Sequence, residues 1–351
     1  MPFLRISAGL ICLLAAGTPA VRPLPAVKDS VPRTMRMEVT QSRLAFASRQ
    51  DGNWEIYVMD GDGGNQVRLT NRPEQDRFPL WSPDGSRIAF GSQVGARGWE
   101  LWVMNSDGSG PRPVWSRISA KGLRQWSPDG TRIALASDRA GNLDIYAARA
   151  DGTGAARLTS AEGDDRDPSW SPDGGSLLFS SMRDGNSEIY VMRANGTGQT
   201  RLTHHGAKDE MPVWSPDGSA IAFVSARDGN RELYLMQPDG HGLVRLTNDP
   251  ASDFVPVWSP DGSRIAFQAL RGDNYDIEVV EVKSRRRARL TAVPEYDGLF
   301  AWSPDGTRLA FISGRDGHDD LWSMAATGDQ VRRVTAEESL NPAWSPVSSS
   351  R

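Results

Sequence analysis

One unit of about 44 residues recurs seven times along this 351-residue chain. Each copy holds Trp-Ser-Pro, a run similar to Ile-Ala-Phe, an acid followed by a run such as Ile-Tyr-Val-Met, and a segment close to Arg-Leu-Thr. The first element contains Trp81, Trp126, Trp170, Trp214, Trp258, Trp302 or Trp344. Four short apolar runs in a repeat of roughly 40–50 residues are typical of one blade of a β-propeller, so the period predicts the fold.

The two ends of the repeat array are out of step. The chain enters the array at the second element, Leu44-Ala45-Phe46, and leaves it on an isolated first element around Trp344. The fourth element begins at Arg68, Arg112, Arg157, Arg201, Arg245, Arg289 or Arg333. We therefore predict an all-β fold, a seven-bladed β-propeller of four-stranded antiparallel blades over residues 42–347. Velcro closure by the C-terminal strand would remove the open sheet edges of a linear array.

The apolar runs fit strands rather than helices. They are four to six residues long and rich in β-branched, aromatic and aliphatic side chains, and turn sequences such as Pro216-Asp217-Gly218 separate them. This alternation of short runs and turn residues is typical of antiparallel strands joined by hairpins. With 24% charged and 38% hydrophobic residues, the composition is ordinary for a globular chain.

The segment before the repeats has its own character. Residues 1–20 place Arg5 before an apolar run and end in small residues, which predicts a secretory signal peptide. Residues 21–41 predict a flexible leader and residues 348–351 a short tail. Cys12 lies inside the predicted signal and is the one cysteine of the chain, so the mature protein would form no disulfide. We expect a periplasmic or extracellular protein without stable membrane insertion, because the apolar run is too short for a lasting anchor.

Charge and motifs limit the function. The formal net charge is −4, which gives no basic field for nucleic acid. The one basic cluster, residues 285–287 with Arg289, is either a solvated loop or a docking patch. Neither His-Glu-x-x-His nor Gly-x-Ser-x-Gly occurs in the sequence. We therefore predict no enzyme activity, no catalytic residues, no metal and no cofactor.

Three features that recur in nearly every copy predict framework. The repeated tryptophan is suited to wedge between adjacent blades. An acid stands before the third apolar run in every copy: Glu55, Glu100, Asp144, Glu188, Glu232, Asp276 and Asp320. A few residues earlier an arginine recurs: Arg49, Arg139, Arg183, Arg227, Arg271 and Arg315. Because these two positions flank one hairpin, we predict that the acid and the arginine pair across the turn.

One recurring position is better placed for binding. Five residues before the tryptophan, an aspartate occurs in five copies: Asp76, Asp165, Asp209, Asp253 and Asp297. Lys121 and Ser339 replace it in the other two copies. Because this position starts the innermost strand, the carboxylates should gather at one mouth of the central channel and attract a cation or a basic peptide. Alternatively, each aspartate caps its own loop by accepting backbone hydrogen bonds.

The residues beside this position differ from copy to copy. Arg77, Arg166, Glu210 and Phe254 directly follow four of the aspartates. Variable side chains on a constant frame are how a propeller acquires a specific ligand surface. The predicted binding residues are therefore the five aspartates together with Lys121, Arg77, Arg166, Glu210 and Phe254.

The cadence of Trp-Ser-Pro-Asp-Gly, Ile-Ala-Phe, Ile-Tyr-Val-Met and Arg-Leu-Thr resembles the propeller repeat of the TolB family and of related WD40-like proteins, over about residues 43–346. The resemblance implies a non-enzymatic periplasmic module that binds proteins in the cell envelope as part of the Tol-Pal system. It also implies a Pal-like lipoprotein as the protein or peptide ligand. TolB has six blades and a preceding α/β domain, whereas this sequence has seven repeats after a short leader.

Three functions remain open from the sequence. The first is a TolB-like, monomeric interaction module that binds its partner through the channel mouth. The second is a propeller enzyme or carbohydrate-binding protein whose acids at the channel mouth hold a metal or act as general acid and base. The third is an accessory propeller of a separately encoded envelope machine or peptidase.

Overall fold

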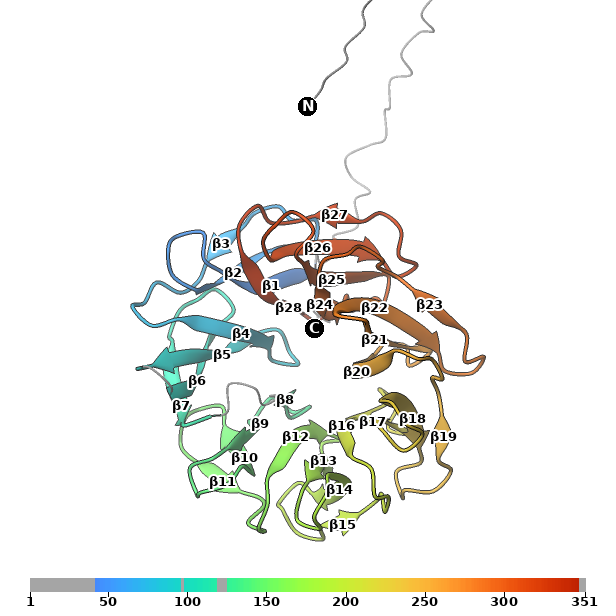
Figure 1. Cartoon of the computed structure of the whole chain (residues 1–351). Helices are drawn as coiled ribbons and strands as arrows, with labels where there is room; N and C mark the ends of the chain where they lie inside the picture. The colour runs from blue at the N-terminus through green and yellow to red at the C-terminus, as the bar shows by residue number, and fades with distance from the viewer. Residues whose placement is uncertain (1–41, 96–97, 119–124, 347–351) are drawn as a thin grey trace, which may run out of the picture. The chain divides into compact units, whose positions relative to one another are not determined.

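The computed structural model describes residues 42–95, 98–118 and 125–346. In these residues 28 strands form seven four-stranded sheets around a central axis, and no helix occurs (Figure 1). The prediction of an all-β propeller with seven antiparallel blades is therefore confirmed. The predicted signal peptide, leader and tail lie outside the described residues, and so does Lys121. Within the described residues there is no helix that could cross a membrane.

Each blade runs from an inner strand at the channel to an outer strand at the periphery, and the blades are numbered here by the position of their second strand along the chain. Blade 1 contains β28 (Ser339–Trp344), β1 (Arg43–Ser48), β2 (Glu55–Asp60) and β3 (Val67–Arg68). Blade 2 contains β4 (Asp76–Trp81), β5 (Arg87–Val94), β6 (Gly98–Asn105) and β7 (Arg112–Ser116). Blade 3 contains β8 (Gln125–Trp126), β9 (Arg132–Ser137), β10 (Asp144–Arg149) and β11 (Ala155–Arg157).

Blades 4 to 7 repeat the same order. Blade 4 contains β12 (Asp165–Trp170), β13 (Ser176–Ser181), β14 (Glu188–Arg193) and β15 (Thr200–Arg201). Blade 5 contains β16 (Asp209–Trp214), β17 (Ile221–Ser225), β18 (Glu232–Met236) and β19 (Val244–Arg245). Blade 6 contains β20 (Ser252–Trp258), β21 (Arg264–Arg271), β22 (Asn274–Glu281) and β23 (Arg287–Arg289). Blade 7 contains β24 (Asp297–Trp302), β25 (Arg308–Ser313), β26 (Asp320–Ala325) and β27 (Arg332–Arg333).

The ring closes where the sequence predicted. The last strand, β28, is the inner strand of the first blade and pairs antiparallel with β1, with Leu44 opposite Trp344 and Ala45 opposite Ala343. The backbone N–H of Arg43 donates to Ser345 Oγ at 2.8 Å, and the N–H of Ser345 donates to the Arg43 carbonyl at 2.7 Å. One blade therefore joins both ends of the repeat array, and this pairing leaves no open sheet edge at the seam.

The hydrophobic core lies between the blades, where the apolar faces of neighbouring sheets meet. One of its clusters, for example, contains Ile56 and Val58 of blade 1 and Phe90 and Met104 of blade 2, all fully buried. The repeated tryptophan joins the inner strands of neighbouring blades, because Trp126 Nε1 donates to the Leu80 carbonyl at 3.1 Å and Trp302 Nε1 to the Val257 carbonyl at 3.2 Å. The predicted role of the tryptophan as a wedge between blades is confirmed.

A bulge interrupts the inner strand of six blades, two residues after the position of the aspartate. The residues there are Phe78, Asp167, Met211, Val255, Leu299 and Asn341, all with φ between 46° and 59°. The strand pairing shifts at the same point, for example between Phe254 and Val257. A β-bulge re-aims the side chains next to it, and it separates the start of each inner strand from the tryptophan at its end.

Val255 is the costliest residue to hold in this left-handed conformation, because it is β-branched. We expect Val255→Asn to raise the free energy of unfolding by about 1 kcal/mol, since asparagine adopts this conformation readily and the site borders an open hollow. Urea unfolding measures the change. Val257→Asn, two residues further along the same strand, is the control and should lower stability. A loss of stability in both variants would show that no strain is stored at the bulge.

Candidate functional site

The aspartates that begin the inner strands are inside the blades. All five are fully buried. In blade 4, Arg183 Nη2 lies 3.0 Å from Asp165 Oδ2, and its Nε donates to Ser181 Oγ at 2.7 Å, directly opposite Asp165 in the sheet. The same pairing joins Arg227 to Asp209 at 2.9 Å and Arg315 to Asp297 at 3.1 Å.

The prediction that the hairpin arginine pairs with the acid of the third strand is therefore wrong. In blade 4 the hairpin arginine reaches inward to Asp165, and the acid Glu188 pairs with Arg201 of the outer strand at 2.7 Å. Glu188 also accepts a hydrogen bond of 2.6 Å from Thr203 Oγ1. The reason is the order of strands in the sheet: the third strand lies beside the outer strand, whereas the second strand, which carries the hairpin arginine at its end, lies beside the inner strand.

The aspartates form neither an exposed acidic rim nor loop caps, so both placements expected from the sequence are wrong. Their side chains lie inside the sheet packing, and among the described residues no backbone N–H donates to Asp165, Asp209, Asp253 or Asp297. Buried carboxylates held by guanidinium groups are framework, because neither charge is free to meet a ligand. The variable neighbours of the aspartates are the better candidates for binding.

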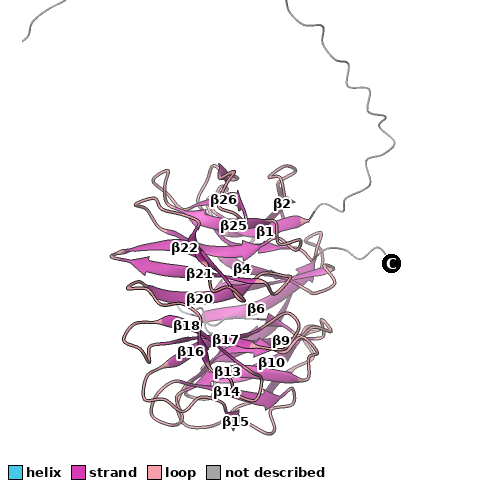
Figure 2. Cartoon of the chain, turned by 90° about the vertical axis from the view of Figure 1, so that its right-hand side faces the viewer, coloured by secondary structure: helices cyan, strands magenta, loops and turns pink. Residues whose placement is uncertain are grey.

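These neighbours lie on the face of the ring where the inner and third strands begin. Figure 2 shows the ring from the side, with the loops gathered at the ends of the strands. We call the variable side chains of this face the mouth ring: Trp54, Arg77, Phe78, Trp99, Arg166, Asp167, Glu210, Arg231, Phe254, Tyr275 and Tyr296. The predicted residues Arg77, Arg166, Glu210 and Phe254 all belong to it, and each is at least partly exposed.

Contacts within the mouth ring pass from one blade to the next. Glu210 pairs with Arg231 at 3.4 Å, and the Arg231 guanidinium lies 5.3 Å from the centre of the Phe254 ring. Phe254 packs edge-on against Tyr275, and Tyr275 against Tyr296, with ring centres 5.9 and 6.0 Å apart. This row of charged and aromatic side chains spans blades 5, 6 and 7 without a break.

A second part of the mouth ring lies on blades 1 and 2. The Arg77 guanidinium stacks over Trp54 of blade 1 at 4.4 Å, and Phe78 packs edge-on against Trp99 at 5.3 Å. Sequence reasoning missed Trp54, Trp99 and Tyr275, as it missed Arg231. The signal was present, because these residues all precede the acid of the third strand, and that position also differs between copies.

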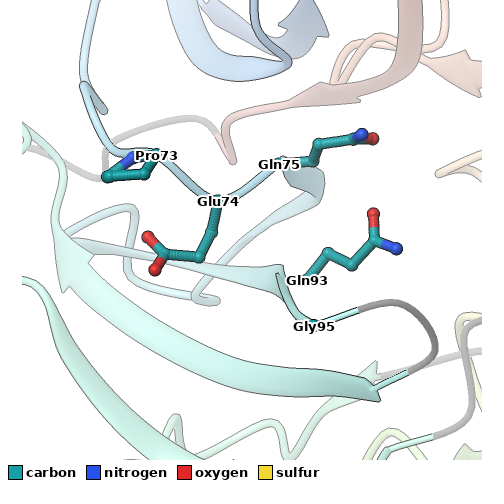
Figure 3. Close-up of a pocket in the computed structure, with 5 residues that line it drawn as sticks. All are labelled: Pro73, Glu74, Gln75, Gln93 and Gly95. Carbon is teal, nitrogen blue, oxygen red and sulfur yellow. The ribbon is translucent and has the colours of Figure 1, made fainter.

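Two hollows open beside the mouth ring. One, of about 250 Å³, lies between blades 4 and 5 and is lined by Asp164, Arg166, Asp167, Ser180, Met182, Ser187, Lys208 and Glu210. Burial raises the pKa of Asp167, and a hydrogen bond of 3.2 Å from Ser180 Oγ opposes that rise. The other hollow, of about 280 Å³, lies at blade 2 and is lined by Pro73, Glu74, Gln75, Gln93 and Gly95 (Figure 3). Both hollows present polar groups of the kind that recognise a peptide or a charged side chain.

The basic cluster of blade 6 divides into two parts. Arg287 turns inward and pairs with Asp253 at 3.0 Å and with Glu278, and Arg289 pairs with Asp276 at 2.7 Å. Residues 285 and 286 are exposed. The cluster thus supplies framework charge, with an exposed loop at its start. The described residues contain no group of three or more His, Cys, Asp or Glu side chains placed to hold a metal ion.

Comparisons with known proteins agree with this architecture. The family model described as "TolB beta propeller domain" matches residues 116–212, 174–253, 209–274 and 246–350, which together cover more than half of the chain. A protein named TolB homolog from Chlorobaculum tepidum is 42% identical over 57 residues, which is 16% of this chain and 13% of that protein. The matched region thus spans about an eighth of this curated relative.

Solved structures share the fold. TolB from Acinetobacter baumannii is similar with a TM-score of 0.57 and 22% identity, over 87% of this chain and 67% of that one. A puromycin-hydrolysing peptidase of Mycobacterium tuberculosis is similar with a TM-score of 0.62 and 18% identity, over 86% of this chain and 54% of that one. At these identities the similarity concerns the propeller alone.

Proposed function

Because this chain belongs to the TolB β-propeller domain family, we propose that it is a non-enzymatic binding module of the cell envelope that holds a protein or peptide partner on the mouth ring. One observation carries the proposal: the combination of mouth-ring side chains changes from blade to blade, whereas the buried pairing of aspartate with arginine beneath them recurs in blades 4 to 7. Aromatic and arginine side chains are also the residues that contribute most to protein interfaces. The row from Glu210 to Tyr296 offers both kinds over three blades.

The place of action and the partner are part of the same proposal. The predicted signal peptide supports export to the periplasm or the extracellular space. Several curated relatives carry the name Tol-Pal system protein TolB, and this name supports a Pal-like lipoprotein as the partner. The predicted signal peptide and the relatives' name thus point to the same compartment.

Alanine variants of the mouth ring test the proposal. We expect Arg231→Ala, Phe254→Ala and Tyr275→Ala each to weaken binding of the soluble domain of a Pal-like lipoprotein from the same organism by about tenfold or more, because each removes a side chain that is partly exposed and anchored by its neighbours. Isothermal titration calorimetry with the mature chain gives the affinities.

Matched controls lie on the outer strands. Val67 and Leu243 are exposed apolar side chains at the periphery, on or next to β3 and β19, and their alanine variants should bind as the wild type does. If the mouth-ring variants keep full affinity, or if the peripheral variants lose it, the binding surface is elsewhere. If the wild type does not bind the lipoprotein, the proposed partner is wrong.

A further inference from the structure

The turn between the third and outer strands follows one pattern in six of the seven blades. In these copies a glycine stands eight residues after the acid of the third strand: Gly63, Gly108, Gly152, Gly196, Gly240 and Gly328. Each has a positive φ, between 77° and 90°. The turn also lies close to the outer strand of the preceding blade, because a Cβ added to Gly240 would be 2.9 Å from the Leu202 carbonyl oxygen. Glycine serves both the φ and the close approach.

The turn of blade 6 departs from this pattern. Ser284 stands where the other copies have glycine, and Lys283, Arg285 and Arg286 surround it. The other six copies have no lysine or arginine at these three positions. The residue with a positive φ in this turn is Arg285, at 57°, a conformation that a residue other than glycine adopts uncommonly. One blade therefore presents a cluster of cations at a turn that is neutral or acidic in the others.

A hollow of about 410 Å³ opens beside this turn. It lies between blades 5 and 6 at the outer strands β19 and β23, which are at the periphery of the ring (Figure 1). Leu246 holds in blade 5 the place that Leu202 holds in blade 4. The hollow therefore lies where the turn glycine of other blades makes its close approach. Its lining residues are Arg245, Leu246, Thr247, Asn248, Arg285 and Arg287.

Of the three arginines that line the hollow, Arg285 has an uncommitted guanidinium. Arg245 pairs with the buried Glu232 at 3.0 Å, and Arg287 pairs with the buried Asp253 at 3.0 Å. Within the described residues, the Arg285 side chain forms no hydrogen bond or ion pair, and no acidic side chain lines the hollow. Its charge is thus available to an anion that enters.

The groups around the hollow suit the same kind of ligand. Asn248 is exposed, and its side-chain amide has no hydrogen-bond partner within residues 42–95, 98–118 and 125–346, so it can donate beside the guanidinium. Lys283 is exposed, and Arg286 is 77% exposed although it pairs with Glu281 at 3.0 Å. A carboxylate can accept two parallel hydrogen bonds from one guanidinium, so an acidic side chain matches these donors.

We propose that the hollow beside Arg285 binds an aspartate or glutamate side chain from an acidic segment of a second protein partner, and that Lys283 and Arg286 attract that segment. The site goes beyond the proposed function, because none of its lining residues belongs to the mouth ring. A protein fits better than a lipid surface. The uncommitted guanidinium lines a recess between two blades, which a single side chain can enter and a flat layer of headgroups cannot.

The first test uses a short peptide in place of the partner. In ligand-observed NMR at about pH 7 and about 25 mM salt, where charges are screened little, acetyl-Gly-Glu-Gly-Glu-Gly-amide should bind the mature chain, and its glutamine analogue should not. Arg285→Gln should weaken binding of the glutamate peptide about fivefold or more. Arg149→Gln is the matched control, because it removes an exposed arginine at the end of the third strand of blade 3, and it should leave binding unchanged. No binding by the wild type, or equal losses in the two variants, would overturn the proposal.

Vesicles distinguish a protein ligand from a lipid surface. Co-sedimentation with phosphatidylcholine vesicles that contain about one third phosphatidylglycerol measures binding to an anionic membrane. The wild type and Arg285→Gln should sediment equally, because headgroups do not reach the recess. If the vesicles bind the wild type and Arg285→Gln abolishes this binding, the site recognises lipid and the proposal is wrong.

The second test gives blade 6 the turn of blade 5. Lys283→Asp, Ser284→Gly, Arg285→His and Arg286→Gly together install the sequence of residues 239–242. Binding of the glutamate peptide should be lost, and the melting temperature should stay the same or rise, because glycine adopts the positive φ of that turn readily. A grafted chain that still binds the peptide would contradict the proposal. If the graft melts at a lower temperature, Arg285→Gln decides alone, since it changes one exposed side chain.

A variant of the mouth ring separates this site from the proposed function. Phe254→Ala should leave binding of the glutamate peptide unchanged, and Arg285→Gln should leave binding of the Pal-like lipoprotein unchanged, because the two surfaces share no residue. Loss of peptide binding in Phe254→Ala would place the acidic ligand on the mouth ring and overturn the proposal. Loss of lipoprotein binding in Phe254→Ala alone supports the proposed function and leaves the blade 6 site to be decided by the peptide measurements.

Discussion

Deletion of residues 339–351 should abolish the cooperative unfolding transition of this protein. The deletion removes β28, so β1 loses its inner neighbour and the ring loses its closure. Leu340 packs against the cores on both sides of blade 1, and the Ala343 carbonyl accepts the hydrogen bond of Trp81 Nε1 at 3.1 Å. Because the net stability of a domain is only about 5–15 kcal/mol, losing these contacts together should leave no stable ring.

Near-ultraviolet circular dichroism during heating, together with size-exclusion chromatography, measures the effect of the deletion. The control removes residues 347–351 alone and should melt as the wild type does, since β28 stays complete. Adding a synthetic peptide of residues 338–346 to the truncated chain should restore part of the transition, because the edge of β1 is a template for that strand. A truncated chain that melts cooperatively at the wild-type temperature would show that blade 1 holds without its inner strand.

The second large effect is expected at a buried carboxylate of the framework. Glu188→Ala should lower the free energy of unfolding by about 3–5 kcal/mol, the usual cost of removing one partner from a buried charged pair. Glu188 is fully buried and accepts from Arg201 Nη2, Thr203 Oγ1, Asn186 Nδ2 and the His205 N–H, at 2.7, 2.6, 3.0 and 3.1 Å. One substitution therefore leaves several donors without an acceptor. Urea denaturation followed by tryptophan fluorescence measures the loss.

Blade 2 offers the matched control for this prediction. Glu100 occupies the same place in the repeat, but it is partly exposed, and it accepts a hydrogen bond from Trp102 Nε1 at 3.1 Å. Glu100→Ala should lower the free energy of unfolding by about 1 kcal/mol, because water can hydrate the donor groups that lose the carboxylate. Equal losses of stability in the Glu100 and Glu188 variants would mean that the buried hydrogen bonds of Glu188 add no stability beyond that of a partly exposed carboxylate at the same position of the strand.

The fold was predictable because the same sequence unit recurs at a regular spacing. The staggered ends of the array, Leu44 at the start and Trp344 at the finish, were enough to predict seven blades and the strand that closes them. Alignment of the repeats failed locally at blade 2. Arg112 was matched to the arginines of the fourth element, yet Pro113 lies opposite Trp102, where blade 4 has Arg201 opposite Tyr190. The spacing to the preceding acid shows this displacement, because Arg112 follows Glu100 by 12 residues, whereas the arginine follows the acid by 13 residues in the other six copies.

The partners of the buried charges were less accessible to sequence reasoning. Arg183 is close in sequence to Glu188, and proximity along the chain suggested that they pair. In the sheet, Arg183 lies next to the inner strand and Glu188 next to the outer one, so each charge finds its partner 13 to 18 residues away. Glu210 and Phe254 of the proposed mouth ring were among the binding residues predicted from the sequence, and their role in binding stays a prediction. The residues that connect Glu210 and Phe254 to the next blades could be identified only from the structure, in which the inner and third strands begin on the same face of the ring.

The hydrogen bonds between Arg43 and Ser345 have a consequence for how this protein can be rearranged. Because hydrogen bonds hold the two ends of the repeat array side by side, a short linker can join them. New chain ends can then be opened in a turn elsewhere in the ring. A circular permutant opened between two blades would then close its ring through contacts between whole sheets instead of strand pairing within one. Comparing its unfolding rate with that of the native order would measure how much the present position of the seam contributes to kinetic stability.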